Sequence, residues 1–168
     1  RHKTLENYFK IKNHLLKSSE IRIYNYDDFY LKSSSKKLAK GIWVSSDCKN
    51  KSIENCDFWL DKKGYIVEKG ITLFHSDVLK LKGKHNILNL LLATAAARKI
   101  GLTGENIKNS LKNYEQLPHR LETIYNSRNF EVINDSKATN FDSSFSGIKS
   151  LENGQIIIIG GRLKKGDS

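Results

Sequence analysis

Four consecutive isoleucines occupy positions 156–159 and lead directly into Gly160 and Gly161. A continuous run of β-branched residues is typical of a strand that is buried on both faces, as in a parallel sheet covered by helices. Apolar residues at helical spacing predict a helix just before this run, over residues 141–151. A strand, a helix and a second strand in that order predict a right-handed βαβ unit, and therefore an α/β fold.

The rest of the chain alternates between helical and strand periodicities. A helix is predicted over residues 5–17, with Thr4 as its start signal, and a buried helix is predicted from Asn86 to Gly101. A third helix is predicted after Thr103, which would cap it. Strands are predicted at residues 21–26, 41–45, 57–61, 64–68, 70–75, 121–125 and 130–133. The strands between residues 57 and 75 would form a small meander, with turns at the two Lys-Gly pairs of this segment. The single proline, Pro118, follows a helix and marks the expected boundary between domains at 1–117 and 118–168.

Composition excludes several classes of protein. The chain has 168 residues, of which 38% are hydrophobic, so it can bury a core in one medium or two small domains. No apolar run reaches the roughly 18 residues of a membrane span, and no signal peptide follows Arg1. Cys48 and Cys56 form neither a disulfide scaffold nor a metal motif and are expected to be inert. We therefore expect a reduced, cytoplasmic protein, and the lack of methionine suggests a fragment of a longer one.

The net charge of +11 is the clearest compositional bias. Lysines far outnumber arginines and are scattered along the chain, whereas proteins that read nucleic acid usually depend on arginine. The charge therefore indicates compositional bias first, anionic substrates second and nucleic acid third. A basic nucleic-acid-binding module stays open as an alternative, and it would bind with a steep salt dependence.

Two polar motifs precede the expected second domain. GKHNILN, at 83–89, begins a helix, where free backbone N–H groups and the helix dipole favour anions. Asn86 within it would either cap the helix or bind a nucleotide base. LPHRLE, at 117–122, contains Arg120, which would either bind phosphate through its guanidinium or pair with Glu122 at the surface.

Two further polar motifs follow predicted strands, where α/β proteins bind ligands. In INDSKATN, at 133–140, Asp135 could hold a ribose hydroxyl or a magnesium-bound water, and Lys137 could neutralise a phosphate or carboxylate. Thr139 or Asn140 could cap the next helix. In GGRLKK, at 160–165, the glycines allow a ligand to approach the backbone, but the motif is neither GxGxxG nor a P-loop.

Taken together, GKHNILN, AAARKIGL, LPHRLE, INDSKATN and IIIIGGRLKKG resemble, in this order, the Mur ligase family. INDSKATN resembles most closely the members that add D-glutamate. The resemblance covers nearly the whole chain and is weakest over residues 19–80. It implies that residues 1–117 are the later part of a central ATPase domain and that residues 118–168 begin a Rossmann-like C-terminal domain, which receives the amino acid. The P-loop of the ATPase domain would lie upstream.

The resemblance also implies an activity. The protein would be an ATP-dependent carboxylate–amine ligase that adds D-glutamate to UDP-N-acetylmuramoyl-L-alanine through an acyl phosphate, in peptidoglycan biosynthesis. ATP and Mg²⁺ would be its cofactors and small molecules its partners. It would be a monomer that neither binds nucleic acid nor enters a membrane, and the fragment alone would be inactive. A related ligase that adds another amino acid, or glutamate to folate, is the alternative within the family.

The resemblance assigns roles to individual residues as well. Those expected to contact ATP are Asn86, Arg120 and Asp135, the last through the ribose. Those expected to face D-glutamate and the reacting phosphate are Lys137, Thr139 and Lys164, with Lys165 as the alternative to Lys164.

Two more residues are expected in the catalytic machinery together with Lys137. His119 would stand beside the cleft. Lys12, in the segment YFKIK, would be carbamylated and bind a magnesium ion, because a carbamate turns a cation into a hard oxygen ligand. A plain lysine on a helix face is the alternative for Lys12. One departure from the family is Lys3, which stands where a glycine is common.

Overall fold

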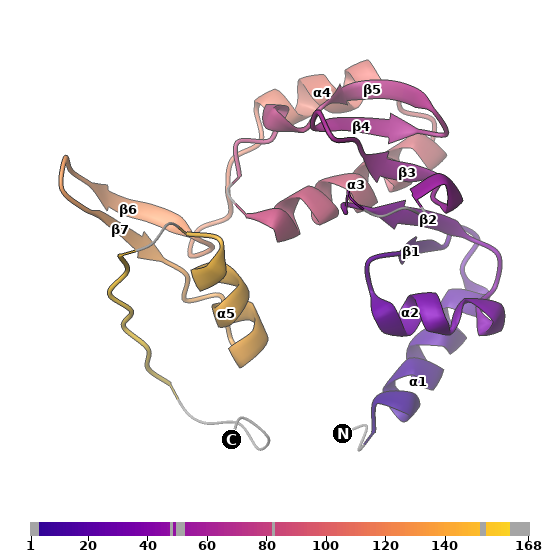
Figure 1. The fold of residues 1–168 in the computed structure, drawn as a ribbon, viewed down its shortest axis with the longest axis horizontal. Coiled ribbons are helices and arrows are strands. Elements are labelled where there is room, and N and C mark those ends of the chain that lie inside the picture. Colours follow the sequence, from indigo (N-terminus) through magenta and orange to yellow (C-terminus); the bar gives the residue numbers. More distant parts are fainter. Residues whose placement is uncertain (1–3, 48, 50–52, 82, 152–153, 162–168) are drawn as a thin grey trace. The chain divides into compact units, whose positions relative to one another are not determined.

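A computed structural model describes residues 4–47, 49, 53–81, 83–151 and 154–161 (Figure 1). The chain divides into two compact units. The first unit consists of Arg1–Leu79 and Ile87–Asn113, and the second of Lys80–Asn86 and Tyr114–Ser168. The domain boundary expected at Pro118 stays a prediction.

The first unit is built on a five-stranded sheet with the order β1-β2-β3-β4-β5. Strands β1, β2 and β3 run parallel, whereas β3, β4 and β5 are antiparallel neighbours. The predicted meander therefore exists, but it continues the parallel sheet and does not form a separate layer. The strands are β1 (Ile23–Asn25), β2 (Ile42–Ser45), β3 (Phe58–Leu60), β4 (Tyr65–Glu68) and β5 (Ile71–His75). The helices are α1 (Leu5–Ser18), α2 (Phe29–Ser33), α3 (Lys84–Lys99) and α4 (Gly104–Lys112), and short 3-10 turns cover Ser35–Lys37, Ile53–Asn55 and Ser76–Val78.

The core of this unit lies between the sheet and the helices α3 and α4. Leu91 and Ala95 of α3 are fully buried, as is Val44 of β2, and Ile107 of α4 completes the same cluster. Leu90 of α3 belongs to the cluster as well, and strands β2–β5 supply the remaining members, Ile42, Phe58, Ile66 and Phe74. Mixed strands and helices around this core confirm the α/β fold class, and α3 is the buried helix that the apolar spacing predicts.

Side-chain caps begin two of these helices at the predicted residues. The Thr4 hydroxyl accepts a hydrogen bond from the Asn7 backbone N–H at 3.2 Å, at the start of α1. Thr103 and Asn106 form a reciprocal capping box at the start of α4. Both caps confirm the start signals in the sequence. Helix α2, by contrast, is not among the predicted helices, and it begins at a cap formed by Asp28.

The second unit contains a two-stranded antiparallel sheet and one helix. Strand β6 (Glu122–Asn126) pairs with β7 (Glu131–Asn134), and α5 (Phe141–Lys149) follows. All three elements agree with the sequence prediction. Asn140 caps α5 by accepting a hydrogen bond from the Ser143 backbone N–H at 2.8 Å, so the cap is Asn140 and not Thr139.

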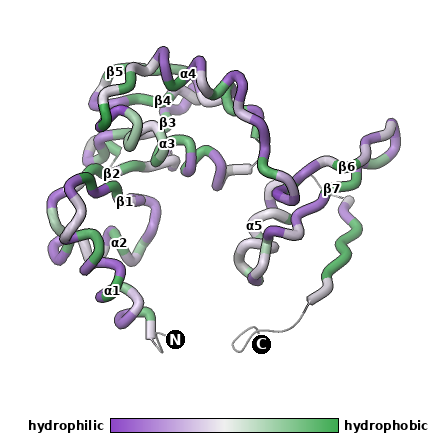
Figure 2. The backbone as a smooth tube through the Cα atoms, turned by 180° about the vertical axis from the view of Figure 1, so that it is seen from behind, coloured by the Kyte–Doolittle hydropathy of each residue, from purple (hydrophilic) through white to green (hydrophobic). Residues whose placement is uncertain are grey.

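The isoleucine run at residues 156–159 does not form the predicted buried strand. The segment has no secondary structure, and the side chains of Ile156 and Ile158 are 96% and 95% exposed. Figure 2 shows it as an apolar stretch that belongs neither to the two strands nor to α5. A parallel strand needs a hydrogen-bonded neighbour, and within the described residues the only partner of β7 is β6. The predicted βαβ unit is therefore not formed in this part of the chain.

The structure bears on the expectation that the cysteines are inert. Cys56 is a buried free thiol, and burial raises its pKa to about 12, so it stays protonated and unreactive near neutral pH. Cys48 lies outside the described residues.

Among the helices of the described residues, none is long and apolar enough to cross a membrane.

His75 closes the hairpin of β4 and β5 through both nitrogens of its ring. Nδ1 lies 2.8 Å from a carboxylate oxygen of Asp77, and Nε2 lies 2.8 Å from the backbone carbonyl oxygen of Lys63. The carboxylate and the carbonyl are both acceptors, and the ring donates to both only when both nitrogens carry protons. The Asp77 backbone N–H also lies 3.2 Å from Nδ1 and donates to it when that nitrogen is unprotonated. The Asp77 carboxylate, followed by the Lys63 carbonyl, accordingly raises the pKa of His75 above its ordinary value.

We expect this hairpin to lose stability as the pH rises. A pKa that is raised in the folded state stabilises the fold fully below the unfolded pKa of about 6.5, and this contribution disappears as the pH passes the folded pKa. His75→Gln keeps an amide donor for the Lys63 carbonyl but cannot titrate. The difference in urea midpoint between the wild type and His75→Gln should therefore shrink as the pH rises above about 6.5. A difference that is independent of pH would contradict the assignment.

We also expect Thr94→Val to stabilise the first unit. The Thr94 side chain is fully buried on α3, and its hydroxyl has no hydrogen-bond partner among the described residues. Valine has nearly the same shape and removes this unsatisfied group, which should raise the free energy of unfolding by about 1 kcal/mol. Thr103→Val is the matched control, because the Thr103 hydroxyl does accept a hydrogen bond as the cap of α4. Its loss should lower the free energy of unfolding by about 1 kcal/mol. Urea unfolding measures both, and equal signs for the two variants would disprove the prediction.

Candidate functional site

The turn between Pro118 and β6 has an unusual backbone. His119 and Leu121, on either side of Arg120, have φ angles of +66° and +46°. Residues with a side chain rarely adopt this left-handed conformation, and each instance costs about 1–3 kcal/mol. The turn therefore persists because surrounding groups hold it.

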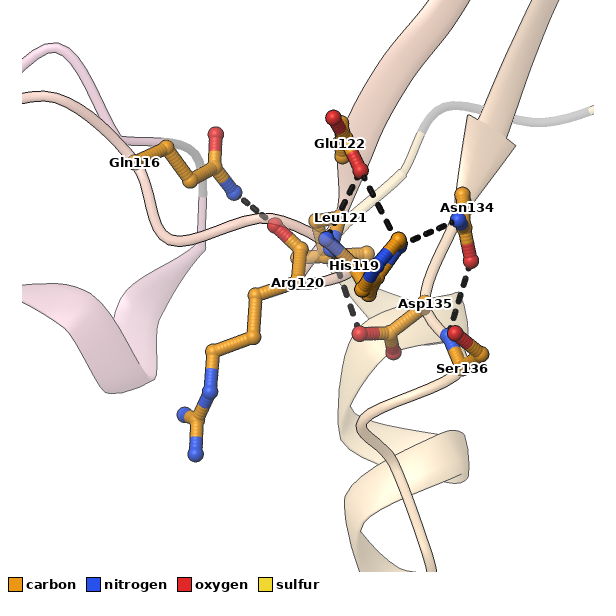
Figure 3. A network of polar contacts seen from close by, with 8 residues as sticks. All are labelled: Gln116, His119, Arg120, Leu121, Glu122, Asn134, Asp135 and Ser136. Atoms are coloured by element: carbon orange, nitrogen blue, oxygen red, sulfur yellow. Dashed lines mark hydrogen bonds and ion pairs between the residues drawn. The ribbon is translucent and has the colours of Figure 1, made fainter.

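The N-terminal half of the turn is held on both sides of His119. Its backbone N–H donates to the Glu122 carboxylate at 2.7 Å, and its carbonyl accepts from the Lys137 backbone N–H at 3.0 Å. The Gln116 side-chain amide also donates to the carbonyl of Arg120. Figure 3 shows the Arg120 side chain extending away from these contacts. The network holds the backbone and leaves the guanidinium outside it.

The C-terminal half of the turn depends on Asp135. The Leu121 backbone N–H donates to Oδ1 of Asp135 at 3.1 Å, and the Leu121 side chain is buried. The other carboxylate oxygen, Oδ2, lies against α5 at Gly147, where a Cβ atom would come within 2.6 Å of it. Asp135 thus joins the left-handed turn to the helix that follows β7, and the missing side chain of Gly147 leaves room for its carboxylate.

The segment after β7 is folded by its own polar groups. Oδ1 of Asn134 accepts a hydrogen bond from the Ser136 backbone N–H at 3.1 Å, which forms an Asx turn. The carbonyl of Asp135 accepts from the Ala138 backbone N–H at 2.9 Å. These two turns, followed by the Asn140 cap, set the course of the chain from β7 into α5. The Lys137 side chain is exposed beside the turn that contains Arg120.

Several predicted site residues are therefore brought together. Segments 119–121 and 135–137 are joined through backbone and side-chain hydrogen bonds, which places His119, Arg120, Asp135 and Lys137 in one neighbourhood. Asn86 belongs to the same compact unit, and Thr139 is exposed on the loop before α5. Lys164 and Lys165 lie outside the described residues.

Two interpretations of single residues are wrong. Helix α3 begins at Lys84, so Asn86 lies within its first turn and is not at the N-cap position. Glu122 does not pair with Arg120 either. Its carboxylate accepts the backbone N–H of His119, because the left-handed φ of His119 turns that N–H toward the start of β6.

Gln116 and Gly147 take part in this site although the sequence motifs did not indicate them. Gly147 had a usable signal: a glycine inside a helix costs about 0.5–1 kcal/mol relative to alanine, so it often marks a close approach. Gln116 had none, because its role depends on the conformation of the turn four residues later.

The described residues do not by themselves form a magnesium site. Lys12 is an exposed residue of α1 in the first unit, and its ammonium lies 5.6 Å from the centre of the Tyr8 ring. No group of three or more His, Cys, Asp or Glu side chains suited to a metal occurs among the residues that the structure describes. A carbamate on Lys12 would supply one oxygen ligand and would need others from outside this set.

The charges and donors of the second unit suit a phosphorylated ligand better. Arg120 and Lys137 are both exposed, and the imidazole of His119 is 53% exposed. Guanidinium and ammonium groups bind phosphate oxygens through charge-assisted hydrogen bonds. Oδ1 of Asp135 accepts only the Leu121 N–H among the described contacts, and a carboxylate oxygen can accept a second hydrogen bond, such as one from a hydroxyl.

Comparison with known proteins gives a consistent result. The family model for the Mur ligase middle domain matches residues 1–97. UDP-N-acetylmuramoylalanine–D-glutamate ligase of Prochlorococcus marinus (strain MIT 9515) is 60% identical over 166 residues, which are 99% of this chain and 35% of the relative. The same ligase of Prochlorococcus marinus (strain MIT 9312) is 56% identical over 98% of this chain and 35% of the relative. That of Synechococcus sp. (strain CC9605) is 38% identical over 100% of this chain and 36% of the relative. The chain spans about a third of the length of these relatives.

The contact between Gly147 and Asp135 leads to a prediction about stability. Gly147→Ala should lower the free energy of unfolding by about 1 kcal/mol, because the displaced carboxylate leaves the buried Leu121 N–H without its acceptor. In an Asp135→Ala background the same change should become stabilising by about 0.5–1 kcal/mol, since only the gain in helix propensity remains. Urea unfolding of the four proteins measures both effects. The same sign in both backgrounds would show that the two residues are not coupled.

Proposed function

Because the chain belongs to the Mur ligase family, we propose that the protein to which it belongs joins D-glutamate to UDP-N-acetylmuramoyl-L-alanine with consumption of ATP, in peptidoglycan biosynthesis. The observation that carries this proposal is the 60% identity over 99% of the chain with a ligase of that name. The basic neighbourhood around Arg120 agrees with it, because ATP and the UDP-linked substrate are both polyanions.

Within this proposal, the second unit binds the nucleotide. Arg120 would contact ATP phosphates together with Asn86, and Asp135 would accept a hydroxyl of the ribose. The hydrogen bonds around His119 and Leu121 support this role, because they fix the backbone that carries the guanidinium before any ligand arrives. Such preorganisation avoids the cost of ordering a loop during binding.

Lys137 would stabilise negative charge at the reacting carboxylate and phosphate, with Thr139 and Lys164 facing D-glutamate. Catalysis of this kind depends mainly on positioning and on charges that are already in place, because the reaction builds up charge on oxygen atoms. His119 would stand beside the same site. Lys12 would contribute a carbamate ligand to magnesium, a role that rests on the family resemblance alone.

The proposed function is tested on the full-length protein by phosphate release from ATP. UDP-N-acetylmuramoyl-L-alanine is supplied with D-glutamate, L-glutamate or L-lysine, or without an amino acid. Release that requires D-glutamate supports the proposal. Release with another amino acid would keep an amide ligase but overturn the substrate, and no release with any amine would overturn the reaction itself.

We expect Lys137→Ala in the full-length protein to lower kcat about a hundredfold or more, the usual effect of losing one preorganised electrostatic contact. Lys149→Ala is the matched control, because Lys149 is also an exposed lysine of the second unit and its ammonium packs on Phe145. The control should leave kcat unchanged. A Lys137→Ala enzyme as fast as the control would remove Lys137 from the site.

A further inference from the structure

The Asn134 side chain can lie in only one orientation. Its Oδ1 accepts the Ser136 backbone N–H at 3.1 Å, so its amide nitrogen is directed to the ring of His119, where it lies 2.9 Å from Nδ1 (Figure 3). Rotation of the amide by half a turn would place the NH₂ group against the Ser136 N–H, and two donors would face each other. The hydrogen bonds of the Asx turn therefore assign the amide.

This orientation determines the protonation of the imidazole. The Asn134 amide nitrogen is a donor, so Nδ1 of His119 must be the acceptor, and the proton of the neutral ring is then on Nε2. Oε2 of Glu122 lies 3.4 Å from the same Nδ1, which alone would favour a proton there. The shorter contact with Asn134 outweighs it, because Glu122 already accepts the His119 backbone N–H at 2.7 Å.

Nε2 of His119 is left as a donor without a partner among the described residues. The ring is more than half exposed. Arg120 follows His119 in the chain, and Lys137 donates its backbone N–H to the His119 carbonyl, so two residues with cationic side chains lie near the ring in the backbone. An N–H donor in a basic segment of this kind suits an anionic oxygen atom. It suits proton abstraction poorly, because the unprotonated nitrogen faces Asn134 and not the exposed side.

We propose that Asn134 is a positioning residue that fixes His119 in the Nε2-protonated tautomer, so that His119 donates a hydrogen bond to a phosphate oxygen of the nucleotide and does not act as a general base. The ligand part of this inference rests on the proposed nucleotide site. The tautomer part depends only on the hydrogen bonds within the second unit.

The tautomer is tested by ¹⁵N NMR of the full-length protein labelled at histidine, with the signals of His119 assigned by their loss in His119→Gln. We expect the proton on Nε2 in the wild type. Asn134→Asp keeps an acceptor for the Ser136 N–H but places a carboxylate oxygen against the ring, so it should move a proton onto Nδ1. Asn129→Asp, an exposed asparagine of the β6–β7 turn, makes the same charge change elsewhere and should leave the His119 signals unchanged. A proton on Nδ1 in the wild type, or no change in Asn134→Asp, would overturn the positioning role.

The role as a donor is tested by ATP affinity, measured by calorimetry. Glutamine places its amide nitrogen near the position of imidazole Nε2, whereas asparagine reaches only as far as Nδ1. His119→Gln should therefore keep the Kd for ATP within about threefold, and His119→Asn should weaken binding about 10- to 100-fold, the usual effect of losing a hydrogen bond to a charged group.

Backbone strain alone would weaken ATP binding more in His119→Gln than in His119→Asn. Asparagine tolerates the left-handed conformation of residue 119 better than glutamine does. A loss confined to His119→Asn therefore cannot come from strain. Equal affinities for the two variants would overturn the donor role. Because this measurement needs no D-glutamate, a wrong amino-acid substrate in the proposed function would leave its outcome unaffected.

Discussion

The hydrogen bond from the Leu121 backbone N–H to the Asp135 carboxylate is the contact on which the arrangement of the second unit depends. It joins a turn that precedes β6 to a loop that follows β7, fourteen residues later in the chain. The β6–β7 sheet is small, and a two-stranded hairpin alone is marginally stable in water. Asp135 adds a constraint that the sheet cannot supply, because its other oxygen rests against α5 at Gly147. Turn, hairpin and helix are thus connected through one carboxylate.

The two units use different means to hold their structure. In the first, apolar side chains of the sheet pack on α3 and α4, and burial of this kind is proportional to area and does not depend on direction. In the second, directional hydrogen bonds around His119 and Leu121 hold two strained residues. Hydrogen bonds specify geometry more sharply than apolar contacts do, because they weaken steeply as distance and angle change. The backbone that carries Arg120 is therefore held by the second kind of support, directional hydrogen bonds.

Local chemistry in the sequence predicted most of the elements but not how the site is assembled. Thr4 and Thr103 marked helix starts correctly, since a cap and its partner lie three residues apart and need nothing else. The prediction of a buried strand at the isoleucine run, residues 156–159, is wrong. Burial of a strand depends on neighbouring strands, and a local sequence pattern contains no information about them. Asp135 was predicted as a ligand-binding residue. Its contacts with Leu121 and Gly147 join segments on both sides of the hairpin, and spacing alone could not reveal them.

The net charge of +11 did not indicate where the site lies, because a total charge, like a local pattern, contains no information about which segments meet in the fold. Most of the lysines are solvated side chains, and a screened surface charge contributes little to any particular interaction. Arg120 and Lys137 differ from the other basic residues because hydrogen bonds hold the backbone segments to which they belong. The carbonyl of His119, next to Arg120 in the chain, accepts the N–H of Lys137, so the main chain keeps these two residues in neighbouring segments. A backbone that is already held in place presents its side chains to a ligand without first being ordered, and the hydrogen-bond network, not the composition, identifies where the backbone is held.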